Sequence, residues 1–239
     1  MNELAIVIPV YNEAENIRTA IERIEARLTV PHAIYLVYDM DGDTTLPAAR
    51  AAAADFRAPV VFLKNKYGRG VLNAIKTGLD EADAPLLIVT MADLSDPPEV
   101  MNRMVETANA ERADVVCASR YMAGGRQYGG LRLKSLFSRL AGISLHRLTG
   151  IPTHDISNSF KLYRRTMLDA LTIESRGGFE IGMEITVKAF IAGYTVSEVP
   201  TTWRDRQAGQ SRFKLWAWLP LYLRWYWYCI SHKRTRHVR

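Results

Sequence analysis

The segment LAIVIPVYNEAENI, residues 4–17, holds the pattern that decides the fold. Its apolar first half, residues 4–10, is short and rich in β-branched side chains, as expected of a fully buried strand in a parallel sheet. An amphipathic stretch follows and reaches about residue 28. Because Asn12 is followed three residues later by Glu15, a capping-box pattern, we expect this helix to begin near Glu13.

The same alternation of strand and helix recurs along the chain. Further strands are predicted at 33–38, 59–63, 85–91 and 113–119, and helices at 47–55, 70–82 and 97–111. This pattern predicts an α/β fold with a mostly parallel, doubly wound sheet flanked by helices. After Tyr121 we expect a long helix near 131–148, a strand at 158–164, a helix near 180–192 and a strand at 194–203. No linker marks a boundary, so we expect a single domain over 1–212 and a C-terminal segment over 213–239.

The charge of the chain is concentrated at its C-terminal end. The 239 residues carry a net charge of +6, but residues 201–239 alone carry +8, with Asp205 as their only acid. A negatively charged partner is therefore expected at the C-terminal end. The only cysteines, Cys117 and Cys229, are far apart in sequence, which favours a reducing compartment over a disulfide framework or a zinc site.

Polar residues gather where the predicted strands end, which is where open α/β sheets bind their ligands. They are Tyr11, Asn12 and Glu13 after the first strand, Asp39, Asp41 and Asp43 after the second, Asp93 and Asp96 after the fourth, and Arg120 after the fifth. Clustered carboxylates suit a hard cation such as Mg²⁺ or Mn²⁺, which can neutralise a leaving diphosphate. The glycine fingerprint of a dinucleotide site is missing after the first strand, so a hydride-transfer enzyme is not expected.

Eight segments, in order, resemble glycosyltransferase family 2 with the GT-A fold, in its dolichol- or polyprenyl-phosphate mannose synthase-like branch. They are VIPVYNEAENI (7–17), LVYDMDGDTT (36–45), NKYGRGVLNAIKTG (65–78), TMADLSDPP (90–98), SRYMAGG (119–125), DISNSFKLYRR (155–165), FEIGMEITVKA (179–189) and EVPTTWRDRQAGQSR (198–212). The resemblance covers essentially residues 4–212.

The resemblance implies roles for particular residues. The nucleotide sugar would be bound by Tyr11, Asn12, Glu13, Asp39, Asp93, Arg206, Ser211 and Arg212, and the acceptor phosphate by Arg120, Arg132, Lys134 and Arg139. The residues expected to act in catalysis are Asp93, Arg120 and Arg206. Mg²⁺ or Mn²⁺ would be held by Asp93 and Asp96, because Met91 stands where the family has the first acid of its metal motif.

The reaction implied by the resemblance is an inverting transfer of a hexose from a nucleotide-diphosphate sugar to a polyprenyl phosphate. Two alternatives remain open from the sequence. One is a family 2 transferase with a soluble or glycan acceptor, and the other is a degenerate nucleotide-sugar-binding module with little turnover, which Met91 favours.

The C-terminal segment contains FKLWAWLPLYLRWYWYCI, residues 213–230, which is crowded with Trp and Tyr. Lys214, Pro220 and Arg224 interrupt it, so a membrane crossing is not expected. It could be a core helix, but its aromatic residues and basic surroundings favour a helix at a membrane surface. We therefore expect a cytoplasmic protein, peripheral on the inner face of the membrane, with no nucleic-acid partner and with homo-oligomerisation left open.

Overall fold

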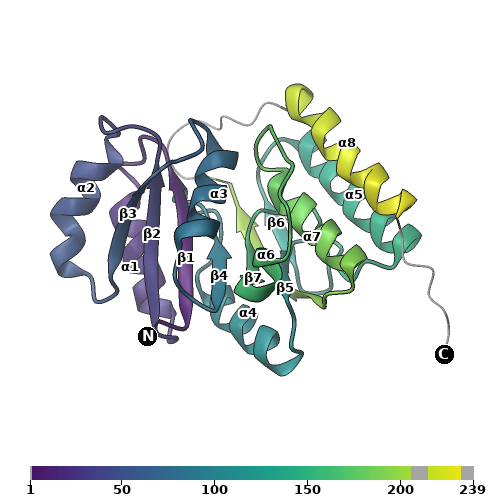
Figure 1. Ribbon diagram of the computed structural model, residues 1–239, viewed down its shortest axis with the longest axis horizontal. Helices are drawn as coiled ribbons and strands as arrows, with labels where there is room; N and C mark the ends of the chain where they lie inside the picture. Colours follow the sequence, from purple (N-terminus) through teal and green to yellow (C-terminus); the bar gives the residue numbers. More distant parts are fainter. Residues whose placement is uncertain (1, 206–214, 233–239) are drawn as a thin grey trace.

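The computed structural model describes residues 2–205 and 215–232, and its central feature is a seven-stranded sheet with the order β3-β2-β1-β4-β7-β5-β8 (Figure 1). All of the strands expected from the sequence are present. Their bounds are β1 Leu4–Val10, β2 His32–Tyr38, β3 Val60–Lys64, β4 Leu86–Val89, β5 Val115–Ser119, β7 Lys161–Arg164 and β8 Val196–Pro200. The predicted mostly parallel α/β sheet is therefore confirmed.

Strand β7 is the exception to the parallel arrangement. It lies between β4 and β5 and is antiparallel to both, so Leu162 is in register with Ile88 on one side and with Val116 on the other. The remaining neighbours in this sheet pair in parallel. Because two antiparallel steps restore the direction, β5 points the same way as β4, and their carboxyl ends reach the same edge.

Helices cover both faces of the sheet. Helices α1 Ile17–Arg27, α2 Thr45–Ala52 and α4 Glu99–Ala110 bury their apolar residues in one core cluster, and the short 3-10 helix η1 Ala53–Asp55 follows α2. Helices α3 Val71–Glu81, α6 Arg165–Asp169 and α7 Ile181–Ala192 pack against the opposite face. Helix α7 is apolar nearly all round because Ile185 faces the sheet while Val187 belongs to a third cluster.

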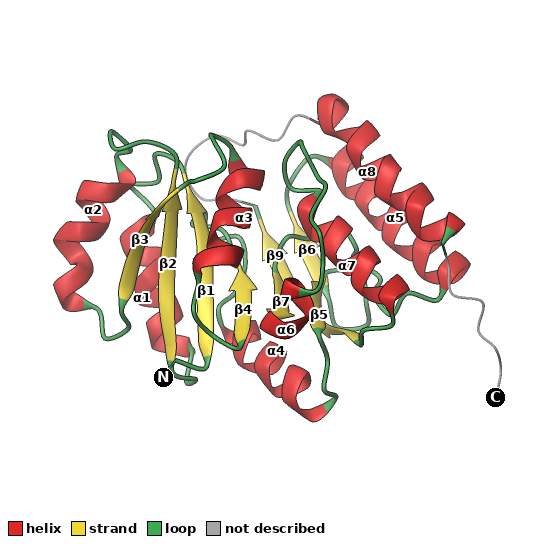
Figure 2. Cartoon of the chain, viewed as in Figure 1, coloured by secondary structure: helices red, strands yellow, loops and turns green. Residues whose placement is uncertain are grey.

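That third cluster joins α7 to α5 Arg132–Thr149 and α8 Leu215–Ser231, which lie side by side at the end of the molecule far from α2 (Figure 2). Trp225 and Cys229 of α8 are buried in it, whereas Trp227 is 61% exposed. Helix α8 therefore has one face packed on the protein and one face turned outward. None of the described helices has the length and the apolar character that crossing a membrane requires.

Two predicted boundaries were wrong. Helix α1 begins at Ile17 because Asp43 accepts a hydrogen bond from the backbone N–H of Asn12 at 3.0 Å, which fixes residue 12 in a left-handed turn with φ of 55°. The Asn12 side chain accepts a hydrogen bond from the backbone of Thr44 at 3.2 Å and does not cap the helix. The last predicted strand divides after Pro200, and β9 Thr202–Arg204 pairs instead with β6 Arg126–Tyr128.

Candidate active site

A cleft of about 690 Å³ opens at the carboxyl ends of β1, β2, β4 and β5. Six of the residues predicted from the sequence line it: Tyr11, Glu13, Asp39, Asp93, Arg120 and Lys134. The opposite wall is formed by α5 and α8, with Phe137 and Ser138 from the former and Trp218 and Tyr222 from the latter. The cleft therefore joins an acidic sheet edge to an aromatic and basic wall.

Asp39 is fixed at this edge by two neutral donors. Its carboxylate accepts hydrogen bonds from the side-chain amide of Asn65 and from the backbone N–H of Gly70, both at 2.9 Å. Gly70 has a φ of 118°, a conformation that residues with a β-carbon rarely adopt, and it begins α3. The turn around Gly70 thus holds the carboxylate of Asp39 at the wall of the cleft, where it can accept hydrogen bonds from a heterocyclic base or a ribose.

Asp93 and Asp96 lie in the loop between β4 and α4. Asp93 lines the cleft, and its Oδ1 accepts a hydrogen bond from the backbone N–H of Ser95 at 3.1 Å. Asp96 is buried and is not among the residues that line the cleft, and its Oδ1 has no hydrogen-bond partner among the described residues. Burial, and then the nearby charge of Asp93, raises the pKa of Asp96 to about 8.

These two side chains suit a hard divalent cation because they offer oxygen ligands. In addition, the buried Oδ1 of Asp96 has no hydrogen-bond partner among the described residues and could bind such an ion. Met91 also lines the cleft, and a thioether is a poor ligand for such an ion. Within residues 2–205 and 215–232, no group of three or more His, Cys, Asp or Glu is placed to hold a metal. The chain can therefore offer Asp93 and Asp96, and substrate phosphates would have to complete the shell.

The pKa of Asp96 predicts a pH dependence of stability. The group ordinarily titrates near pH 3.8, so the folded protein binds this proton more tightly than the unfolded chain does. Its contribution is fully present below about pH 4 and is lost as the pH rises to about 8, at about 1.4 kcal/mol per pH unit within that window. In urea unfolding at pH 5 and pH 8, the wild type should lose more stability than Asp96→Asn. Equal losses in the two proteins would contradict this assignment.

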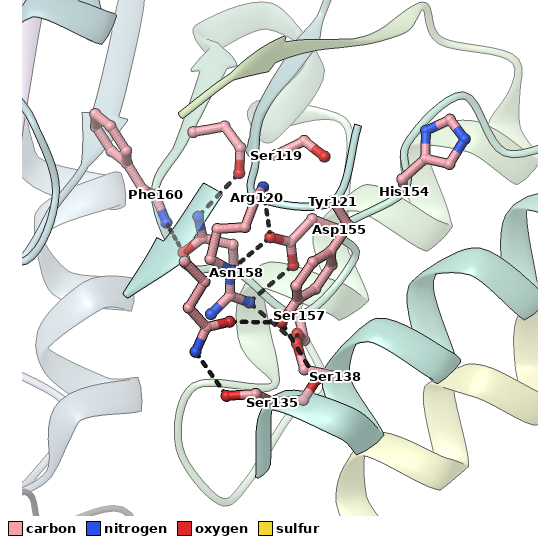
Figure 3. A network of polar contacts seen from close by, with 12 residues as sticks. Ser119, Arg120, Tyr121, Ser135, Ser138, His154, Asp155, Ser157, Asn158 and Phe160 are labelled. Carbon is pink, nitrogen blue, oxygen red and sulfur yellow. Dashed lines mark hydrogen bonds and ion pairs between the residues drawn. The ribbon is translucent and has the colours of Figure 1, made fainter. Parts of the chain in front are cut away.

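Arg120 follows β5 and forms a buried ion pair with Asp155 (Figure 3). Its Nε donates to one carboxylate oxygen at 2.6 Å and its Nη2 to the other at 2.9 Å. Burial alone would lower the pKa of Arg120, but the charge and hydrogen bonds of Asp155 raise it above its ordinary value. Arg120 therefore stays charged where it lines the cleft.

The remaining predicted site residues are placed differently. Arg132 and Arg139 are exposed on α5 and are not among the residues that line the cleft, and Asn12 is engaged in its turn. Arg206, Ser211 and Arg212 lie outside the described residues, so their predicted roles stay predictions.

Sequence reasoning missed the partners of Arg120. Neither Asp155 nor Ser138 is among the residues predicted to form the site. The local sequence DISNSF is mostly polar and gives no sign that the carboxylate of Asp155 is buried beside a cation. The adjacent His154 is engaged elsewhere, since its Nδ1 lies 2.6 Å from Glu198.

Comparison with known proteins adds to this geometry. A model of the family described as "Glycosyl transferase family 2" matches residues 5–172. The chain belongs to this family. The match runs from β1 to just beyond α6, so it contains the ends of β1, β2 and β4, which contribute Glu13, Asp39 and Asp93 to the cleft, but not Asp205 after β9.

Two curated relatives of this chain point to one branch of the family. The chain is 30% identical over 216 residues to the dolichol-phosphate mannosyltransferase of Pyrococcus furiosus, covering 89% of the chain and 59% of the relative. It is 33% identical over 217 residues to the undecaprenyl-phosphate 4-deoxy-4-formamido-L-arabinose transferase of Pseudomonas fluorescens, covering 88% of the chain and 60% of the relative. The chain thus spans about three fifths of the length of these two relatives.

Among solved structures, the glucosyl-3-phosphoglycerate synthase of Mycobacterium tuberculosis, in complex with Mn²⁺, uridine diphosphate and glucosyl-3-phosphoglycerate, has the same fold. Its TM-score is 0.71 at 16% sequence identity, covering 98% of this chain and 82% of that one. The expected GT-A fold is therefore confirmed.

Proposed function

We propose that this glycosyltransferase moves a hexose from a nucleotide-diphosphate sugar to a polyprenyl phosphate at a membrane surface. The observation that carries the proposal is the composition of the cleft, which combines acids at the strand ends with Arg120 and Lys134 and is walled by two helices with apolar outer faces. The names of the two curated relatives support the lipid-linked acceptor. The sugar is left open, because those names contain different sugars.

The nucleotide base and ribose would lie against Tyr11, Glu13 and Asp39, and the diphosphate would lie near Asp93. Asp93 and Asp96 would hold Mg²⁺ or Mn²⁺, which when bound neutralises charge on the leaving diphosphate. A Mn²⁺ complex of the fold relative supports this choice. The ion would displace the proton of Asp96 into solvent, so metal binding should strengthen as the pH rises toward 8.

The acceptor would be the nucleophile in a single displacement. An oxygen of its phosphate attacks the anomeric carbon as the bond from that carbon to the diphosphate oxygen breaks, and the diphosphate leaves with the electron pair. This in-line path inverts the anomeric configuration. A phosphate monoester with a second pKa near 6 is largely dianionic at neutral pH, so it needs orientation and charge compensation more than a strong base. Arg69, Arg120 and Lys134 are the described cations that line the cleft, and we assign both tasks to Arg120 and Lys134.

The experiment that tests the proposal combines a binding measurement with a transfer measurement. Thermal unfolding with nucleotide diphosphates and their sugars, with and without Mn²⁺, identifies the donor, since a ligand at a hundred times its Kd adds about 2.7 kcal/mol of stability. The donor so identified is then incubated with polyprenyl phosphate in vesicles. Transfer supports the proposal, whereas binding without transfer to any acceptor supports the degenerate module that Met91 favours. Transfer to a soluble glycan alone would identify the other alternative.

The membrane part of the proposal rests on the outer face of α5. Leu133, Leu136 and Leu140 recur at helical spacing and are each about half exposed. The charged side chains of α5 are all basic, namely Arg132, Lys134, Arg139 and Arg147. A helix with exposed leucines and only positive charge matches the surface of a bilayer that contains anionic lipid. The inner face of a cytoplasmic membrane is such a surface.

Leu136→Glu is therefore expected to weaken binding to vesicles that contain phosphatidylglycerol. The change removes the free energy gained when the leucine side chain enters the bilayer, which is about 1.5–3 kcal/mol for full burial. It also adds a negative charge that the anionic lipid repels. The affinity should therefore fall at least about tenfold. Cosedimentation with vesicles measures it. Ala51→Glu places the same charge on the exposed side of α2, at the other end of the molecule, and should leave binding nearly unchanged. Equal effects of the two substitutions would remove α5 from the proposed interface.

A further inference from the structure

The guanidinium group of Arg120 is hydrogen-bonded along one edge, and its Cζ lies over the ring of Tyr121, 4.9 Å from the ring centre. Nε and Nη2 donate to the two oxygens of Asp155, and Nη2 also donates to Oγ of Ser138 at 3.0 Å (Figure 3). These contacts use the Nε–H and both hydrogens of Nη2. Among the described residues Nη1 has no hydrogen-bond partner, so two donors of a permanently charged group remain for a ligand in the cleft that Arg120 lines.

Asp155 is placed to hold Arg120 and is poorly placed to meet a substrate. It is fully buried, and it is not among the residues that line the cleft. Both of its oxygens accept hydrogen bonds from Arg120, and one of them also accepts the backbone N–H of that residue at 3.0 Å. A carboxylate so occupied lacks the geometry of a general base, which must reach the proton that it removes.

Helix α5 is part of the same arrangement. Ser138 on α5 is hydrogen-bonded to Ser157, which lies two residues after Asp155. The helix approaches this loop closely at Gly142, where a β-carbon would lie 2.0 Å from the carbonyl oxygen of His154. The position of α5 therefore determines the third partner of the Arg120 guanidinium.

We propose that Asp155 and Ser138 are positioning residues that turn Nη1 of Arg120 toward the phosphate of the acceptor. Asp155 fixes the plane of the guanidinium. The hydrogen bond from Arg120 to Ser138 connects the guanidinium to α5, the helix proposed to lie on the membrane. The acceptor phosphate is bound by donors that are already in place. This inference rests on the proposed function, because it takes the ligand of Nη1 to be the acceptor phosphate.

The test is a double-mutant cycle with Asp155→Asn and Arg120→Met, and farnesyl phosphate as the acceptor. Asp155→Asn alone should lower kcat/KM for farnesyl phosphate by about a hundredfold, mostly through KM, because a misplaced binding group costs about that much. It should leave KM for the donor unchanged. In the Arg120→Met background the same change should have less than about a threefold effect, since Asp155 then has nothing to position. An equally large effect in both backgrounds would show that Asp155 acts on its own and would overturn the inference.

A milder variant covers the case in which Asp155→Asn does not fold. Ser138→Ala removes one contact and should raise KM for farnesyl phosphate about fivefold. Because Ser138 also lines the cleft, the same change in the Arg120→Met background should have less than about a twofold effect if Ser138 acts through Arg120. Ser144→Ala, on the same helix but bonded to Tyr226 rather than to the Arg120 network, is the matched control and should not change KM. If Ser138→Ala leaves KM unchanged, α5 does not position Arg120.

Direct binding of farnesyl phosphate, measured calorimetrically on the same variants, separates the two possible failures. If the wild type binds it but transfers nothing, the proposed function fails. Binding that is weakened by Asp155→Asn only in the presence of Arg120 would still support the positioning role. Transfer by the wild type with no difference among the variants would overturn the positioning role alone.

Discussion

Asp93→Asn should lower kcat for sugar transfer by about 10²–10³-fold, the loss that follows when one preorganised electrostatic contact to a transition state is removed. Asp93 lines the cleft directly after β4, and Met91 cannot replace it as a ligand for a hard cation. The loss should be accompanied by weaker binding of the nucleotide diphosphate in Mn²⁺. Initial rates at saturating donor and acceptor, with a Mn²⁺ titration, measure both effects.

Asp41→Asn is the matched control for that prediction. Asp41 follows strand β2, which ends at the same edge of the sheet, but its side chain is 74% exposed and pairs with the exposed Lys64 at 2.6 Å. Exposed pairs of this kind contribute little, so the rate should change less than about twofold. If Asp93→Asn retains more than a tenth of the wild-type rate, the donor diphosphate does not depend on Asp93.

Arg120→Met should destabilise the protein by about 3–5 kcal/mol, because it leaves the carboxylate of Asp155 buried without its cation. For a chain of this length the corresponding fall in Tm is roughly 6–20 °C, which differential scanning calorimetry would detect. The double variant Arg120→Met/Asp155→Asn removes both charges and should recover more than half of the loss. Arg139→Met, on the exposed face of α5, should change Tm little. A double variant no more stable than Arg120→Met would show that the ion pair is not the cause.

The strands could be predicted from the sequence because most of them are short apolar runs rich in β-branched residues, although the last predicted strand divides after Pro200. The orientation of β7 could not, since it depends on which strands Leu162 meets, and these lie about 45 to 75 residues earlier in the chain. Among the acids at the predicted strand ends, Glu13, Asp39 and Asp93 line the cleft, whereas Asp41, Asp43 and Asp96 do not. For Asn12, however, the local pattern was misleading, because the carboxylate of Asp43, from the next strand end, competes for its backbone.

The site likewise contains residues that the local sequence can place and residues that only contacts between distant segments place. Asp39, Asp93 and Arg120 could be placed from the order of the strands, because parallel strands end at one edge. The partners of Arg120 come from α5 and from the loop before β7, after the simple alternation of strand and helix has ended. Their proximity depends on a close approach at Gly142 that no spacing in the sequence encodes.

The place of β7 in the sheet also bears on how the chain folds during synthesis. Strands β4 and β5 are each bonded to β7 and not to one another, so four residues, Lys161–Arg164, join the half that carries the acids to the half that carries Arg120. A ribosome delivers β7 more than 40 residues after β5 has emerged. Until then the nascent chain has one incomplete sheet, β3-β2-β1-β4, and a strand β5 without a partner, and their open edges can pair with other chains. Assembly of the cleft is thus a late event, and this stage is where we expect the growing polypeptide to depend most on chaperones.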